Sequence, residues 1–167
     1  MTYRDIIKKC FEMYLNREQY AYWYGARGAY LSDSTMLYLT QTDEGKKYYS
    51  RFDPDTIRRW MDWSRGKTGY DCSGFVGAVT GIDVYSLALW DMATDKTTPR
   101  EGPEGSLLFT TFGGKGRHVG IDIGYGYFMH SRSEGHTLEI GRIEGYGWEG
   151  SGRFPGVDYS GAYELRR

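Results

Sequence analysis

The hydrophobic pattern changes its period near Ser106, and this change constrains the fold of the 167-residue chain more than any other feature. Apolar residues recur at helical spacing before this point, and they alternate with polar residues after it. Helices followed by an antiparallel sheet predict an α+β fold, and this length suits one domain. The expected strands, separated by glycine-rich turns, are 106–111, 118–124, 127–132 and 137–143.

The first part of the chain contains several helix signals. Residues 2–18 are expected to form an amphipathic helix that Thr2 caps, with Cys10 buried on its apolar stripe. Asp53 followed by Pro54 predicts another helix start. Further elements are expected as helices at 34–39, 72–80 and 85–92, and as a last strand near 157–165.

Composition excludes several classes of protein. The 21 basic and 22 acidic residues give a net charge of −1, so neither nucleic acid nor a membrane surface is expected as a partner. No apolar run approaches the roughly 20 residues of a membrane span. Residues 1–9 do not resemble a secretory signal. We therefore expect the chain to remain in the cytoplasm or to leave by a non-classical route such as phage lysis.

Cys72 lies at the start of an expected helix that ends before Gly81. Unpaired N–H groups and the helix dipole favour a thiolate at such a position. A second cysteine alone does not indicate a disulfide framework. The position therefore predicts a cysteine nucleophile with a lowered pKa.

A thiol nucleophile needs a base and a group that orients the base. The three histidines are His118, His130 and His136. Neighbouring antiparallel strands lie about 4.8 Å apart, so His118 can hydrogen-bond His130. This spacing thus predicts a catalytic triad of Cys72, His118 and His130. His136 is expected in a solvated turn. Their spacing matches no zinc site, and no metal or cofactor is expected.

Several motifs together resemble the NlpC family of papain-like cell-wall cysteine peptidases. The family's patterns are similar to Asp71-Cys72-Ser73-Gly74-Phe75-Val76, Gly105–Phe109, His118–Ile121 and His130, and more weakly to Tyr22-Trp23-Tyr24-Gly25-Ala26. The resemblance implies an α+β, papain-like NlpC-type fold. In that fold, N-terminal helices, one of which carries the nucleophilic cysteine, pack on a central antiparallel sheet.

The resemblance also implies roles for individual residues. Cys72 would attack a peptide carbonyl, His118 would transfer the proton and His130 would orient His118. The Tyr22 hydroxyl would join the Cys72 N–H in stabilising the oxyanion. Two further residues, Asp71 and Ser73, would line the substrate subsite beside the nucleophile.

The implied reaction is hydrolysis of bacterial peptidoglycan stem peptides between γ-D-glutamate and the diamino acid. Stem peptides or their fragments are therefore the expected partners, while the oligomeric state is left open. Residues 26–69 are longer than the usual family loop and are expected to be a helical insertion in a single domain spanning 1–167.

Two other functional classes remain open. The same cysteine–histidine pair can serve an amidase, a transpeptidase or an acyltransferase, although a cysteine that precedes the histidine favours the hydrolase. The second alternative is a non-catalytic wall-binding module that has retained the substrate-binding groove of the fold.

Overall fold

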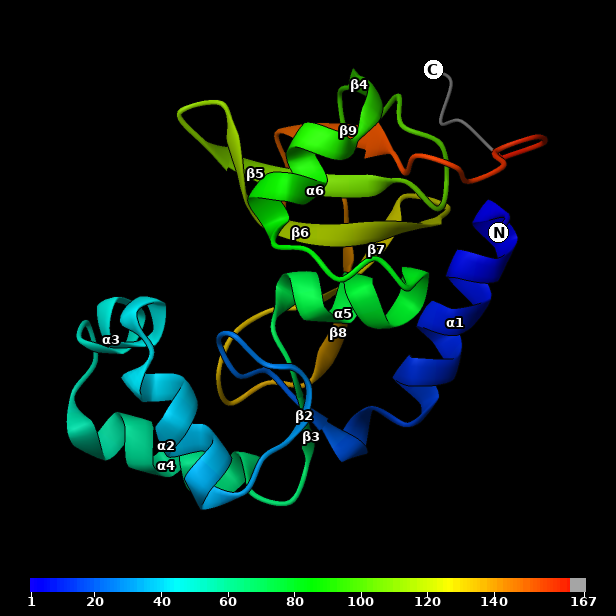
Figure 1. Ribbon diagram of the computed structural model, residues 1–167. Coiled ribbons are helices and arrows are strands. Elements are labelled where there is room, and N and C mark those ends of the chain that lie inside the picture. The colour runs from blue at the N-terminus through cyan, green and yellow to red at the C-terminus, as the bar shows by residue number, and fades with distance from the viewer. Residues whose placement is uncertain (163–167) are drawn as a thin grey trace.

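A six-stranded antiparallel sheet forms the centre of the computed structural model, which describes residues 1–162 (Figure 1). Its strand order is β4-β9-β5-β6-β7-β8. The α+β class expected from the change of period is therefore confirmed. The strands are β4 (Thr94–Thr97), β5 (Leu107–Phe112), β6 (Lys115–Gly124), β7 (Tyr127–Ser131), β8 (Leu138–Arg142) and β9 (Gly150–Arg153).

Short turns join β5 to β6 and β6 to β7, and a loop at 132–137 joins β7 to β8. Gly113 and Gly114 form the first turn with positive φ angles, and Tyr125 adopts a left-handed φ of 54° in the second. The strand expected near 157–165 is wrong where it can be compared, because residues 157–162 form turns apart from a bridge between Asp158 and Thr2. Residues 163–165 of that expectation lie outside the described residues.

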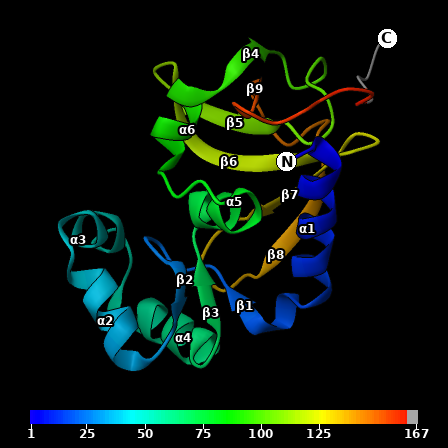
Figure 2. The same ribbon diagram turned by 45° about the vertical axis from the view of Figure 1, so that its right-hand side comes forward.

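Three helices pack around the sheet: α1 (Tyr3–Leu15), α5 (Cys72–Thr80) and α6 (Ser86–Met92). Both α5 and α6 pack on β6, and α1 packs on α5 (Figure 2). The expected buried position of Cys10 on α1 is confirmed, because its side chain is completely buried in the main core. That core places the start of α5 next to strand β6.

The boundaries of α1 and α5 follow from local capping. Thr2 and Asp5 form a reciprocal capping box at the start of α1. Gly81 ends α5 in the left-handed conformation with a φ of 80°, as expected from the sequence. No helix among residues 1–162 is long and apolar enough to cross a membrane.

Residues 26–69 form a helical segment that lies to one side of the large sheet (Figure 1). Ser32, Thr42 and Asp53 cap its three helices. A short three-stranded sheet at its base joins it to the chain on either side. These elements are α2 (Asp33–Gln41), α3 (Asp43–Tyr49), α4 (Pro54–Ser64), β1 (Tyr20–Ala21), β2 (Arg27–Tyr30) and β3 (Thr68–Tyr70), with a 3₁₀ turn at Arg17–Gln19.

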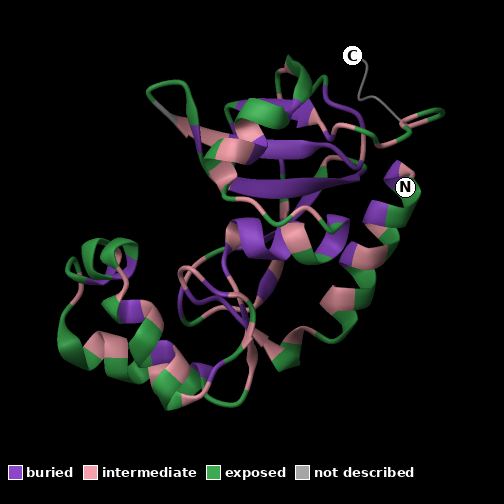
Figure 3. Ribbon diagram, in the orientation of Figure 1, coloured by how far each residue is buried: buried purple, intermediate pink, exposed green. Residues whose placement is uncertain are grey.

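Burial distinguishes the two parts of the molecule. Strands β5 and β6 are largely buried, whereas the outer faces of α2, α3 and α4 are exposed (Figure 3). The helical segment has a small core of its own, in which Trp23, Leu31 and Met36 are completely buried. It is therefore a separately packed layer and needs specific contacts to hold it against the main body.

Glu134, in the loop between β7 and β8, provides such a contact. Its buried carboxylate accepts hydrogen bonds from the hydroxyls of Tyr48 at 2.7 Å and Tyr49 at 2.9 Å. The Tyr49 hydroxyl in turn accepts the backbone N–H of Tyr24 at 3.1 Å. Glu134 thus connects α3 to the sheet.

We predict that Glu134→Ala lowers the free energy of unfolding by about 2 kcal/mol, because it leaves the buried Tyr49 hydroxyl without its acceptor. Urea denaturation measures this loss. Glu144→Ala is the matched control, because the side chain of Glu144 is 71% exposed and its ion pair with Arg100 is worth at most about 1 kcal/mol. Equal losses in the two variants would contradict a specific role for Glu134.

Candidate active site

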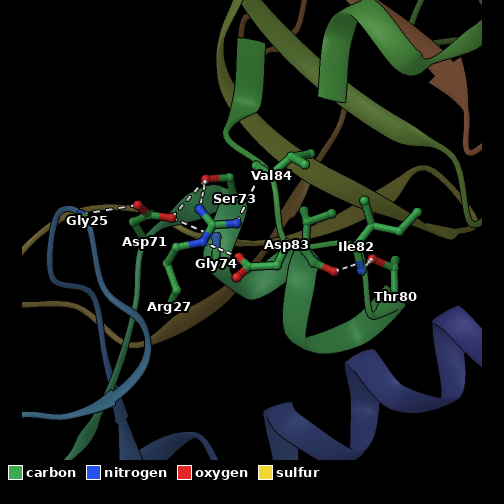
Figure 4. A network of polar contacts seen from close by, with 10 residues as sticks. Gly25, Arg27, Asp71, Ser73, Gly74, Thr80, Ile82, Asp83 and Val84 are labelled. Atoms are coloured by element: carbon green, nitrogen blue, oxygen red, sulfur yellow. Dashed lines mark hydrogen bonds and ion pairs between the residues drawn. The ribbon is translucent and has the colours of Figure 1, made fainter. Parts of the chain in front are cut away.

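The buried side chain of Asp71 fixes the start of α5 (Figure 4). Its Oδ1 atom accepts the backbone N–H of Gly74 at 2.6 Å and the hydroxyl of Ser73 at 3.0 Å. Its Oδ2 atom accepts the backbone N–H of Gly25 at 3.1 Å. Asp71 is therefore the N-cap that makes Cys72 the first residue of the helix.

Arg27 extends this network to β2 and to the loop after α5 (Figure 4). Its guanidinium donates to the Ser73 hydroxyl at 3.1 Å and to the carbonyl of Val84 at 3.0 Å, and it pairs with Asp83. The sequence analysis missed Arg27, because its partners lie 46 and 57 residues away. The hydroxyl of Ser73 is thus held between Arg27 and Asp71.

Two neighbouring strands bring His118 and His130 together, as the strand spacing predicted. The His118 Nε2 atom lies 2.8 Å from the His130 Nδ1 atom. The ring of Trp148 stacks on His118 with centroids 5.6 Å apart, and a Cβ atom at Gly120 would lie only 3.0 Å from that indole. The glycine therefore leaves the space that Trp148 occupies.

Cys72 lies beside this histidine pair. The backbone N–H of Val119, which follows His118 on β6, interacts with the Cys72 sulfur. By surface area, residue Cys72 is neither fully buried nor fully exposed. The start of α5, with Cys72, thus lies against strand β6 at the residue that follows His118.

Burial controls the charges of these groups. It lowers the pKa of His118 to about 4, and it lowers the pKa of His130 to about 3 with help from the neighbouring His118. Burial, together with the nearby Asp71 carboxylate, raises the pKa of Cys72 to about 12. Both imidazoles and the thiol are therefore neutral at pH 7.

The prediction that the helix start lowers the thiol pKa is therefore wrong for Cys72. The backbone N–H groups of Val119, Ser73 and Cys72 do lower this pKa, as the argument from the helix start requires. Desolvation and the negative charge of Asp71 outweigh them. Desolvation, the larger effect, could not be deduced from the local sequence.

Tyr22 follows β1 and lies within the same group of residues. Burial raises its pKa well above the ordinary value, and the neighbouring Cys72 and Glu134 act in the same direction. Tyr48 of α3 lies within electrostatic range of Tyr22, so α3 of the helical segment approaches this group of residues. A phenol with a raised pKa stays protonated and can donate a hydrogen bond near the sulfur.

The remaining polar side chains surround the distal histidine. His136, expected in a solvated turn, is half-exposed but hydrogen-bonds Glu139 at 2.6 Å. Arg132 pairs with the same carboxylate at 3.6 Å, and the Tyr146 hydroxyl lies 3.3 Å from His130 Nδ1. Among residues 1–162, no group of three or more histidine, cysteine or acidic side chains is placed to hold a metal ion.

The site thus combines a cysteine at a helix start with two hydrogen-bonded histidines on the sheet on which that helix packs. The sequence model of the NlpC/P60 family matches residues 59–153, more than half of the chain. The chain therefore belongs to the NlpC/P60 family.

Curated relatives support this assignment. Protein P54 of Enterococcus faecium is 31% identical over 84 residues, which cover 47% of this chain and 16% of that protein. A probable endopeptidase p60 of Listeria seeligeri is 34% identical over 87 residues, which cover 50% of this chain and 16% of that protein. The chain thus matches only a small part of these longer relatives.

Solved structures show the same fold. The peptidoglycan hydrolase RipB of Mycobacterium tuberculosis gives a TM-score of 0.56 at 19% identity, covering 90% of this chain and 65% of that one. The P60 domain of an antigen from M. avium subspecies paratuberculosis gives 0.56 at 16% identity, covering 90% of this chain and 96% of that one. The expected NlpC-type fold is confirmed.

We predict that the alkylation rate of Cys72 by iodoacetamide rises continuously from pH 6 to pH 10, because a pKa near 12 leaves the thiolate fraction growing with pH throughout this range. The measurement uses a Cys10→Ala background, in which Cys72 is the only thiol. A rate that is flat between pH 6 and pH 9 would instead reveal a preformed thiolate–imidazolium pair.

Proposed function

We propose that this chain is a cysteine peptidase domain that hydrolyses peptidoglycan stem peptides. The observation that carries the proposal is the 2.8 Å contact between His118 and His130 beside the Cys72 helix start. Membership of the NlpC/P60 family and the endopeptidase name of the Listeria relative support it. We also propose that residues 1–167 form a single domain and that residues 26–69 are an insertion in it.

The proposed reaction begins with a neutral pair. As the Cys72 sulfur bonds to the peptide carbonyl carbon, the thiol proton moves to Nδ1 of His118, whose Nε2 is engaged with His130. The tetrahedral intermediate then collapses, the C–N bond breaks and the amine leaves with the proton from His118. A thioester to Cys72 remains.

Water completes the cycle. His118 removes a proton from a water molecule as the water oxygen attacks the thioester. The C–S bond then breaks, His118 returns the proton to the Cys72 sulfur, and the carboxylic acid is released. The backbone N–H of Cys72 and the hydroxyl of Tyr22 donate to the oxyanion in both steps. The raised pKa of Tyr22 keeps that donor protonated.

The proposed scissile bond joins γ-D-glutamate to the diamino acid. Asp71 and Ser73 flank the nucleophile, and a carboxylate favours the free ammonium of an N-terminal L-alanine. Because Asp71 and Ser73 are buried and hydrogen-bond each other, this attraction acts through the charge of Asp71 rather than through direct contact.

We predict that Cys72→Ala abolishes cleavage of L-Ala-γ-D-Glu-diaminopimelate peptides, because no other group can form the thioester. Cys10→Ala is the matched control and should retain activity, since Cys10 is buried in the α1 core. Mass spectrometry of the digest measures the newly released amine.

Two outcomes would contradict the proposal. Cleavage by Cys72→Ala would exclude Cys72 as the nucleophile. Failure of the folded wild-type protein to release any amine from purified stem peptides would exclude the proposed substrate.

A further inference from the structure

Glu139 lies directly opposite His130 in the register of β8 and β7, so the two side chains share one face of the sheet. Its Oε2 atom is 3.8 Å from His130 Nε2 and 3.6 Å from a guanidinium nitrogen of Arg132. Its Oε1 atom is 2.6 Å from His136 Nδ1. Tyr146 also lies within electrostatic range of this carboxylate. Glu139 thus faces the imidazole nitrogen that His118 leaves free.

Each neutral imidazole carries one proton on its ring nitrogens. The hydrogen bond between His118 and His130 therefore couples the tautomers of the two rings. If His118 is to accept the thiol proton at Nδ1, its own proton must be at Nε2. It then donates to His130 Nδ1, 2.8 Å away. The proton of His130 must consequently be at Nε2, pointing towards Glu139.

In the opposite arrangement, the hydrogen bond between His118 Nε2 and His130 Nδ1 has its donor and acceptor exchanged. There, His130 donates from Nδ1 to His118 Nε2, and the proton of His118 occupies Nδ1. That nitrogen can no longer act as a base for Cys72. The two arrangements therefore differ in whether the histidine pair can activate the thiol.

A carboxylate beside His130 Nε2 distinguishes between them. It attracts an N–H dipole at that position and repels a lone pair, and 3.8 Å is close enough for this attraction although it is long for a hydrogen bond. His136 and Arg132 hold the carboxylate in place from its other sides. The carboxylate therefore favours the arrangement in which His118 is a base.

We propose that Glu139 is a positioning residue that selects the tautomer of His130 and thereby leaves Nδ1 of His118 free to accept a proton from Cys72. This inference rests on the proposed peptidase function, because it assigns His118 as the base. Glu139 was not predicted from the sequence, where it is one of two charged residues in the expected strand 137–143.

Nitrogen NMR of the free protein tests the inference without any substrate. The ¹⁵N shifts of labelled histidine should show His118 and His130 both protonated at Nε2. In Glu139→Leu, which removes the acceptor but keeps a similar volume, a fraction of His130 should become protonated at Nδ1. Glu144→Leu is the matched control, because this exposed carboxylate pairs with Arg100 away from the histidines, and it should leave the tautomers unchanged.

Kinetics provide the second readout. Glu139→Leu should lower kcat roughly tenfold with little change in KM, the scale seen when a group that orients a histidine is removed. Glu139→Gln, whose carbonyl can still accept from His130 Nε2, should lose less activity and keep more of the Nε2 tautomer.

The two readouts separate failure of this inference from failure of the proposed function. Protonation of wild-type His130 at Nδ1, or unchanged tautomers in Glu139→Leu, would overturn the role of Glu139 even if activity fell. A tautomer change in a protein that cleaves no stem peptide would uphold the positioning role and reject the peptidase assignment.

Discussion

The buried carboxylate of Asp71 is the interaction on which the site depends. It caps α5 through Gly74 and accepts from Gly25, so one side chain fixes the helix start and the aromatic segment that carries Tyr22. Through Ser73 it also reaches Arg27 at the base of the helical segment. Asp71 thus fixes the position of the nucleophile and of its hydrogen-bond donors. It also attaches residues 26–69 to the site.

The same burial that gives precise geometry determines the resting protonation state. An apolar environment disfavours charge on Cys72, His118 and His130, so their pKa values move in the direction that keeps each group neutral. Proton transfer must then accompany the attack of sulfur on the substrate. In such a mechanism the tautomer of the histidine pair is decisive, which gives Glu139 its significance.

Local rules predicted much of this arrangement. The end of α5 followed from the capping signal at Gly81, and the histidine contact followed from the spacing of neighbouring antiparallel strands. The role of Asp71 as the N-cap was not predicted. Trp148 and Glu134 escaped prediction because turn-rich stretches without periodicity bring them to the site. The predicted lowering of the thiol pKa was wrong because desolvation depends on the packing of distant segments. Strand β9 was missed because Gly-Ser-Gly-Arg has no strand pattern.

Trapping of the acyl-enzyme tests the central claim, that Cys72 is activated by the histidine pair, most directly. Wild-type protein is mixed with a stem peptide, quenched in acid during turnover and mapped by proteolysis and mass spectrometry. The account predicts that the L-Ala-γ-D-Glu acyl group is attached to the peptide that contains Cys72, and that His118→Ala does not accumulate it. Acylation of another residue, or turnover without any covalent adduct on Cys72, would contradict the account.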